Sequence, residues 1–159
     1  GWWGNTAVAF SYEGLAWVTG AAVMAAGQLP NGRILLVATL YSLGAHGIMT
    51  LNDFKSVDGD RALGIGSLPA QLGVERAARL ACVVMALPQS VVVGLLATWG
   101  FGTHAAIVAA LLGVQLALTP TLLRSPRAKA PWYNATGVSL YVLGMLVSAF
   151  ALGSTAAAV

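Results

Sequence analysis

The chain has 159 residues, of which 58% are hydrophobic and only 8% are charged. Soluble domains carry about 25% charged residues, so this composition indicates a membrane protein. The formal net charge of +3 comes without a basic stripe of interleaved aromatics, and we therefore expect no nucleic-acid partner. The single cysteine, Cys82, excludes an internal disulfide.

Five stretches of the chain are long and apolar enough to form membrane-spanning helices, each close to the ~20 residues that a bilayer requires. They cover roughly residues 6–26, 34–51, 80–98, 104–123 and 133–153. The third and fourth come from one uncharged run that the segment 99–103 divides. Residues 124–132 read as a basic loop with two prolines. We expect an all-α, polytopic transmembrane bundle.

The segment between the second and third spans, residues 52–79, holds eight of the thirteen formally charged residues. Its first part contains three carboxylates, interleaved with two cations; these residues are Asp53, Lys55, Asp58, Asp60 and Arg61. Such hard oxygen ligands suit Mg²⁺, which binds one or two carboxylates, waters and phosphate oxygens. The cations could bind a diphosphate directly. The alternative is an ordinary solvated loop without chemistry.

The basic residues are distributed very unevenly between the two ends of the predicted bundle. Seven of the eight Lys and Arg residues lie in the 52–79 segment and the 124–132 loop, whereas Arg33 alone lies on the other side. Because loops rich in Lys and Arg stay in the cytoplasm, the aspartate-rich loop and the amino end are expected there.

Two polar residues within the spans need separate interpretations. Glu13 interrupts the first span, and a carboxylate inside a membrane is a functional hypothesis by default; the alternative is a protonated or hydrogen-bonded acid near the helix end. His46 precedes Asp53 by seven residues, which places both on one helical face. It could bind a pigment's magnesium or orient a substrate, or simply hydrogen-bond a neighbouring helix.

The string from Asn52 to Arg61, continued by residues 64–73, resembles the second aspartate-rich motif of intramembrane prenyltransferases of the 4-hydroxybenzoate polyprenyltransferase superfamily. Within that superfamily it is most similar to the chlorophyll and bacteriochlorophyll synthase branch. Residues 1–5, 130–137 and 140–145 also resemble segments of that branch. The resemblance covers nearly the whole chain.

This resemblance implies a nine-helix fold, of which residues 1–159 would form helices five to nine, the carboxyl-terminal part of one transmembrane domain. The first aspartate-rich motif of the family has no match here. The resemblance implies that Asp53, Asp58 and Asp60 are ligands of Mg²⁺ or of its waters. It likewise implies that Asn52, Lys55 and Arg61 contact the diphosphate. The common form of the motif spaces its aspartates four apart, but Ser56 stands four before Asp60, so the direct metal ligand is left open.

The implied reaction is the Mg²⁺-dependent esterification of a (bacterio)chlorophyllide propionate with geranylgeranyl or phytyl diphosphate. Photosynthetic assembly proteins are possible further partners, and an inner or photosynthetic intracytoplasmic membrane is the expected location. A related prenyltransferase with an aromatic or haem acceptor is one alternative, and a non-enzymatic pigment-binding membrane subunit is another. A transporter fragment is disfavoured because the spans show no inverted repeat.

Overall fold

The computed structural model describes residues 1–156, and the side chains of residues 1–153. Within this range all regular elements are helical, and five helices are long and apolar enough to cross a membrane. These run Trp2–Met24, Gly32–Lys55, Val74–Thr98, Gly102–Arg124 and Pro126–Gly153. The predicted number of spans and the all-α bundle are therefore confirmed.

Several spans consist of more than one helical segment. The first contains α1 (Trp2–Ala9), a π-helical turn (Phe10–Gly14) and α2 (Leu15–Met24). The second contains α3 (Gly32–Asn52) and a 3₁₀ turn (Asp53–Lys55). The third and fourth are α6 (Val74–Thr98) and α7 (Gly102–Arg124). The last contains α8 (Pro126–Tyr133), a π-helical turn (Asn134–Val138) and α9 (Ser139–Ala156).

Two segments that the sequence assigned to loops are partly helical. The aspartate-rich segment contains the short helices α4 (Val57–Ala62) and α5 (Leu68–Leu72). The prediction of a loop at 124–132 was wrong, because α8 covers most of it. Pro126 occupies the start of α8, where its missing N–H would have no partner in any case, so this proline starts the helix.

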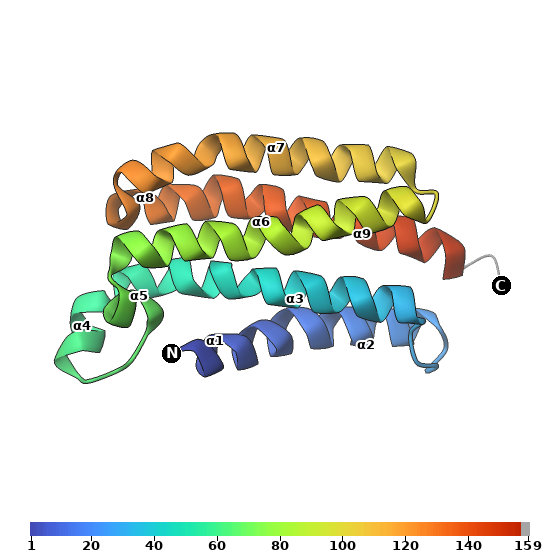
Figure 1. The fold of residues 1–159 in the computed structure, drawn as a ribbon. Helices are drawn as coiled ribbons and strands as arrows, with labels where there is room; N and C mark the ends of the chain where they lie inside the picture. The colour runs from blue at the N-terminus through green and yellow to red at the C-terminus, as the bar shows by residue number, and fades with distance from the viewer. Residues whose placement is uncertain (157–159) are drawn as a thin grey trace.

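Helix α3 lies at the centre of the bundle. It packs against α6 on one side, α9 on another and α1 on a third, while α7 bridges α6 and α9 (Figure 1). Within the apolar window of each span, 67% of the α3 span is buried but only 6% of the first span. The first span is thus attached to the bundle along one side only.

Buried tyrosines join the helices in the bundle interior. Tyr41 Oη of α3 lies 2.8 Å from Ser148 Oγ of α9, and Tyr141 Oη donates to the Tyr41 carbonyl at 2.8 Å. Gly44 leaves the space that the Tyr141 hydroxyl occupies, since a Cβ at that position would overlap it. In a membrane, polar side chains must find such partners inside the protein, so these bonds fix α9 on α3.

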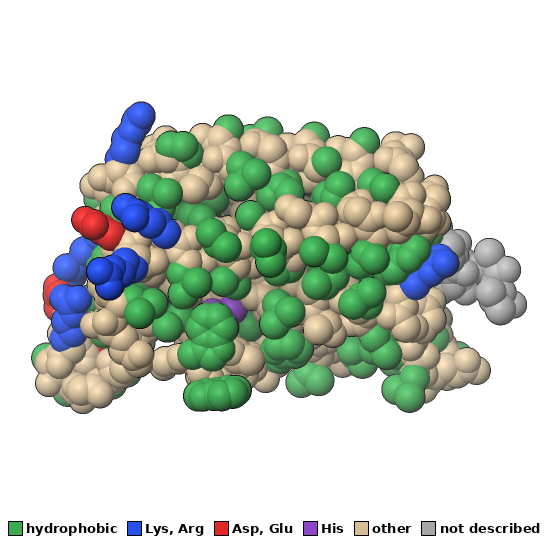
Figure 2. Space-filling model, in the orientation of Figure 1, with side chains coloured by type: hydrophobic (Ala, Val, Ile, Leu, Met, Phe, Trp, Pro, Cys, Tyr) green, Lys and Arg blue, Asp and Glu red, His purple; other side chains and the backbone are tan. Residues whose placement is uncertain are grey.

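Charged side chains gather at one end of the bundle. On the face drawn in Figure 2, Lys and Arg cluster at the end formed by α4, α5 and α8. Arg33, the one Lys or Arg outside the segments 52–79 and 124–132, lies at the start of α3, and its guanidinium lies 5.1 Å from the ring centroid of Trp99. The amino terminus lies at the highly charged end (Figure 1). The fold therefore gives the bundle one polar end, where the candidate site lies.

Candidate functional site

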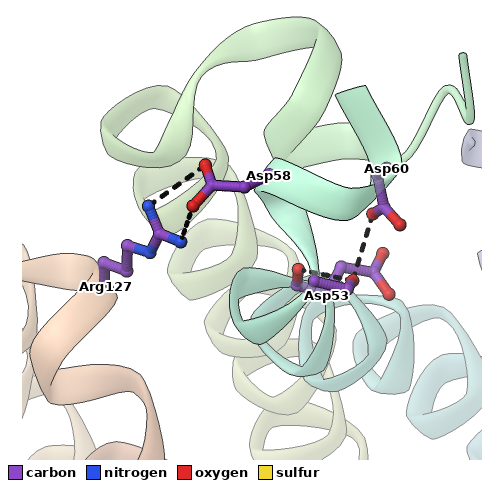
Figure 3. Close-up of polar contacts among 5 residues, drawn as sticks. Asp53, Asp58, Asp60 and Arg127 are labelled. Carbon is purple, nitrogen blue, oxygen red and sulfur yellow. Dashed lines mark hydrogen bonds and ion pairs between the residues drawn. The ribbon is translucent and has the colours of Figure 1, made fainter. Parts of the chain in front are cut away.

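The end of α3 brings its aspartate to the polar end of the bundle. After Asn52 the helix tightens into the 3₁₀ turn Asp53–Lys55, and α4 begins at Val57, after Ser56. Ser56 Oγ lies 3.0 Å from the Asp53 carbonyl oxygen and 3.1 Å from Asp60 Oδ2. One hydroxyl group therefore connects the last turn of the span to the carboxylate of α4 (Figure 3).

Asp53 and Asp60 lie on the same side of this turn. Figure 3 shows their carboxylates close together, and Asp60 lies within electrostatic range of Asp53. Asn5 Nδ2 of α1 donates to Asp53 Oδ2 at 3.3 Å, so the first span orients this carboxylate. The pair is half-buried rather than fully solvated. No sequence pattern points to Asn5 by itself, although Asn5 lies in residues 1–5, one of the segments that carry the resemblance.

Asp58 faces the opposite way. Both Nη atoms of Arg127, from α8, donate to the two carboxylate oxygens of Asp58, one of them at 3.3 Å (Figure 3). The Arg127 guanidinium lowers the pKa of the Asp58 carboxyl below its ordinary value, by hydrogen bonding and by its charge. The two side chains are 54% and 69% exposed, so this ion pair adds little to stability.

The aspartates therefore do not form one three-carboxylate cluster. In the part of the chain with described side chains, no three His, Cys, Asp or Glu residues gather closely enough for a shared metal ion. The geometry brings together Asp53 and Asp60 and places Asp58 apart from them. Two carboxylates at the edge of the membrane fit Mg²⁺, which takes one or two of them and fills its other positions with waters and phosphate oxygens.

The predicted diphosphate contacts lie in different places. Asn52 and Lys55 line a pocket of about 300 Å³ toward α8, together with Arg127 and Asn134. Asn134 Nδ2 donates to Asn52 Oδ1 at 2.9 Å. Arg61 is exposed and forms no hydrogen bond or ion pair with any described side chain. Their contacts with a diphosphate stay a prediction.

His46 lies beneath the first span. Its Nε2 atom lies 3.2 Å from the Trp2 carbonyl oxygen, and its ring centroid is 4.0 Å from that of Trp2. The side chain is only 5% exposed. The structure shows the hydrogen bond to a neighbouring helix, whereas binding a pigment's magnesium and orienting a substrate stay predictions.

Glu13 lies in the π-helical turn of the first span. It lines an apolar cavity of about 620 Å³ between α2, α3 and α9, toward the end of the bundle opposite the aspartates. Its carboxylate forms no hydrogen bond or ion pair among the described side chains. The structure therefore separates Glu13 from the aspartate pair and gives it no task in that site.

The fold and the site together define a polytopic integral membrane protein with a Mg²⁺-compatible carboxylate pair at one membrane edge. Residues 1–143 match the UbiA prenyltransferase family, and the chain belongs to this family. No solved structure matches the chain significantly.

Curated relatives narrow the comparison. The chain is 59% identical to the bacteriochlorophyll synthase 33 kDa chain of Cereibacter sphaeroides, over 96% of this chain and 50% of the relative. It is 47% identical to the bacteriochlorophyll synthase 34 kDa chain of Chloroflexus aurantiacus, over 97% and 49%. It is 38% identical to the chloroplastic chlorophyll synthase of Oryza sativa subsp. japonica, over 95% and 40%. The chain spans about half the length of the bacteriochlorophyll synthases it matches.

Proposed function

We propose that the complete protein containing this chain is a bacteriochlorophyll synthase, which esterifies the propionate of a (bacterio)chlorophyllide with a geranylgeranyl or phytyl diphosphate. The observation that carries this proposal is the Asp53–Asp60 pair at the membrane edge. The pair lies in a chain that is 47–59% identical to bacteriochlorophyll synthases along nearly its whole length. The prenyl chain of such a donor partitions into lipid while its diphosphate stays at the surface, which matches a bundle with one polar end.

In this proposal Asp53 and Asp60 bind Mg²⁺, directly or through its waters. The metal ion, when bound, stabilises the negative charge that grows on the departing diphosphate. Ser56 holds the Asp60 carboxylate beside the turn that carries Asp53, because its hydroxyl contacts Asp60 Oδ2 and the Asp53 backbone carbonyl. Asn5 orients Asp53, so the first span contributes to the site although it is attached loosely.

The chemistry of the acceptor makes few demands on the other residues. A propionate is ionised at neutral pH, so it can attack the first carbon of the prenyl chain without a base. The carbon–oxygen bond to diphosphate breaks, the ester bond forms, and diphosphate leaves. The main barrier lies in that bond cleavage, where preorganised charges have their largest effect.

The charge distribution supports a cytoplasmic position for this site. Seven of the eight Lys and Arg residues lie in the segments at the aspartate end, and Lys and Arg accumulate in cytoplasmic loops. We therefore place the aspartate pair at the cytoplasmic face of the inner or photosynthetic intracytoplasmic membrane. Association with other photosynthetic assembly proteins fits this location.

One structural observation weakens the pigment-binding alternative. A histidine that binds the magnesium of a pigment needs a free ring nitrogen facing the pigment. His46 Nε2 contacts the Trp2 carbonyl, and the Trp2 ring covers the imidazole. The Trp2 carbonyl therefore occupies Nε2, and only Nδ1 is left as a nitrogen that could bind a pigment.

The test uses the complete protein in lipid nanodiscs, supplied with bacteriochlorophyllide, geranylgeranyl diphosphate and Mg²⁺. We expect an esterified pigment and released diphosphate, and no product when 4-hydroxybenzoate replaces the pigment. Product with 4-hydroxybenzoate alone would contradict the tetrapyrrole acceptor but keep the prenyltransferase. The absence of product with either acceptor, for a folded protein, would contradict both.

A further inference from the structure

The pocket lined by Asn52 and Lys55 lies between the end of α3 and α8, on the Arg127 side of the aspartate-rich segment. Its volume is about 300 Å³. Four polar side chains line it, namely Asn52, Lys55, Arg127 and Asn134, and Phe54 and Pro131 contribute apolar surface. The pocket thus combines cations and amides with an apolar wall.

Lys55 and Arg127, the two cations of this pocket, have N–H donors that form no hydrogen bond with the described side chains. Lys55 is exposed and forms no hydrogen bond or ion pair with any described side chain. Arg127 donates to Asp58 from Nη1 and Nη2, but a guanidinium has five N–H donors. The Asp58 carboxylate orients the guanidinium and takes only part of its capacity. The pocket is therefore suited to an anion with several oxygen acceptors.

The pocket is distinct from the proposed metal site. Neither Asp53 nor Asp60 lines it. Figure 3 shows Asp58 and Arg127 on one side of α4, and the Asp53–Asp60 pair on the other. A diphosphate bound through Mg²⁺ to the aspartate pair would then lie apart from Asn52 and Lys55, so this inference replaces the diphosphate contacts that the resemblance implies for these two residues.

The position of the pocket suits a lipid. It lies at the polar end of the bundle, where α8 forms the first part of the span Pro126–Gly153. Lys129 Nζ lies 5.9 Å from the ring centroid of Trp132 on the same helix, and tryptophan is typical of the membrane interface. Basic pockets between transmembrane helices bind the head groups of anionic lipids. Phe54 and Pro131 provide apolar surface for the adjoining glycerol and acyl groups.

We propose that the pocket formed by Asn52, Lys55, Arg127 and Asn134 binds a phosphate group, presented by an anionic phospholipid of the surrounding membrane. The phosphate oxygens accept from Lys55 and from the N–H groups of Arg127 that Asp58 leaves free. Soluble phosphate or diphosphate carries the same chemistry, so the experiment distinguishes the two sources.

The experiment measures lipid binding to the complete protein by native mass spectrometry from detergent, with phosphatidylglycerol added against phosphatidylcholine. The test variant is Lys55→Gln with Arg127→Gln, and the matched control is Arg124→Gln with Lys129→Gln. Each removes two charges at the same end of the bundle, but only the first pair lines the pocket. With about tenfold in affinity for each charge-assisted hydrogen bond that is lost, we expect a loss of about 100-fold for the pocket variant and less than about threefold for the control, which loses no such bond.

A folding defect is separated from a binding defect by a milder variant. Lys55→Gln alone changes an exposed side chain and should leave thermal unfolding unchanged while it lowers phosphatidylglycerol affinity about tenfold. Equal losses in the pocket and control variants would mean diffuse surface attraction and would overturn the proposal.

A parallel titration with inorganic diphosphate, without Mg²⁺, identifies the source of the phosphate. Phosphatidylglycerol binding that depends on Lys55 and Arg127 supports the lipid. Diphosphate binding with the same dependence, but no phosphatidylglycerol binding, keeps the pocket and assigns it a soluble anion, contradicting the lipid source. If neither probe binds, the site does not exist.

Discussion

Replacing Asp60 by asparagine should nearly abolish ester formation by the complete protein, whereas the same change at Asp58 should not. Both residues belong to α4, but Asp60 contacts Ser56 beside Asp53 and Asp58 contacts Arg127 on the other side. Asparagine retains the shape of aspartate and an oxygen that can accept from Ser56. The Asp60→Asn change therefore removes charge from the proposed metal site without removing that contact.

The expected magnitudes differ by about two orders. Removing one preorganised group that stabilises charge in the transition state lowers turnover by about 10² to 10³, which corresponds to about 2.7–4 kcal/mol. Asp58 belongs to an exposed ion pair, and such pairs contribute little. We therefore expect the Asp58→Asn variant to retain turnover within about threefold of the parent protein.

The assay is the initial rate of pigment esterification at several Mg²⁺ concentrations, with thermal unfolding in detergent as the control for folding. The Mg²⁺ concentration at half-maximal rate should rise for Asp60→Asn and stay constant for Asp58→Asn. A folded Asp60→Asn variant with near-normal turnover would refute the assignment of the pair. A folded Asp58→Asn variant as inactive as Asp60→Asn would refute the separation of the three aspartates.

Three further predictions test the surroundings of the site. Asn5→Ala should raise the Mg²⁺ requirement about 10- to 100-fold, because the partner that orients a ligand is lost; an unchanged Mg²⁺ titration would exclude Asn5 from the site. In a Cys82→Ala background, Leu63→Cys, which is 76% exposed as leucine, should react with an impermeant maleimide from the cytoplasmic side and Gln28→Cys from the opposite side; the reverse pattern would overturn the orientation. Gly44→Ala should destabilise the protein by about 1–3 kcal/mol in thermal unfolding, because its methyl group overlaps the Tyr141 hydroxyl. Gly94→Ala, in α6, has open space and should not destabilise the protein, because alanine favours a helix; equal losses of stability would contradict the packing of α9 on α3.

The spans were predictable because their physical cause is local. A helix must be long and apolar to cross the hydrocarbon layer, and both properties depend only on one continuous stretch of the sequence. The second predicted span, 34–51, agrees closely with α3 (Gly32–Asn52). The error at 124–132 arose because prolines interrupt helices in most positions but are well tolerated at a helix start, where Pro126 lies.

The grouping of the aspartates was only partly readable from the sequence. The sequence indicated the cluster of aspartates but not its division. A 3₁₀ turn and Ser56 lie between Asp53 and the rest of α4, so helical periodicity does not predict which aspartates pair. The contact between Asp58 and Arg127 joins residues 69 positions apart, so no local pattern carries it. The same holds for Asn5, which reaches Asp53 across 48 positions.

The hydrogen bond between Tyr41 and Ser148 has a consequence for biosynthesis. The two residues are 107 positions apart, and chains are synthesised at about 5–20 residues per second. The Tyr41 hydroxyl is therefore synthesised about 5–20 s before Ser148, its partner on α9. During that interval the bundle is incompletely folded. The Tyr41 hydroxyl must then form its hydrogen bond with water, a lipid head group or the insertion machinery. Release of α9 into the bilayer is then the step that allows this hydrogen bond to form.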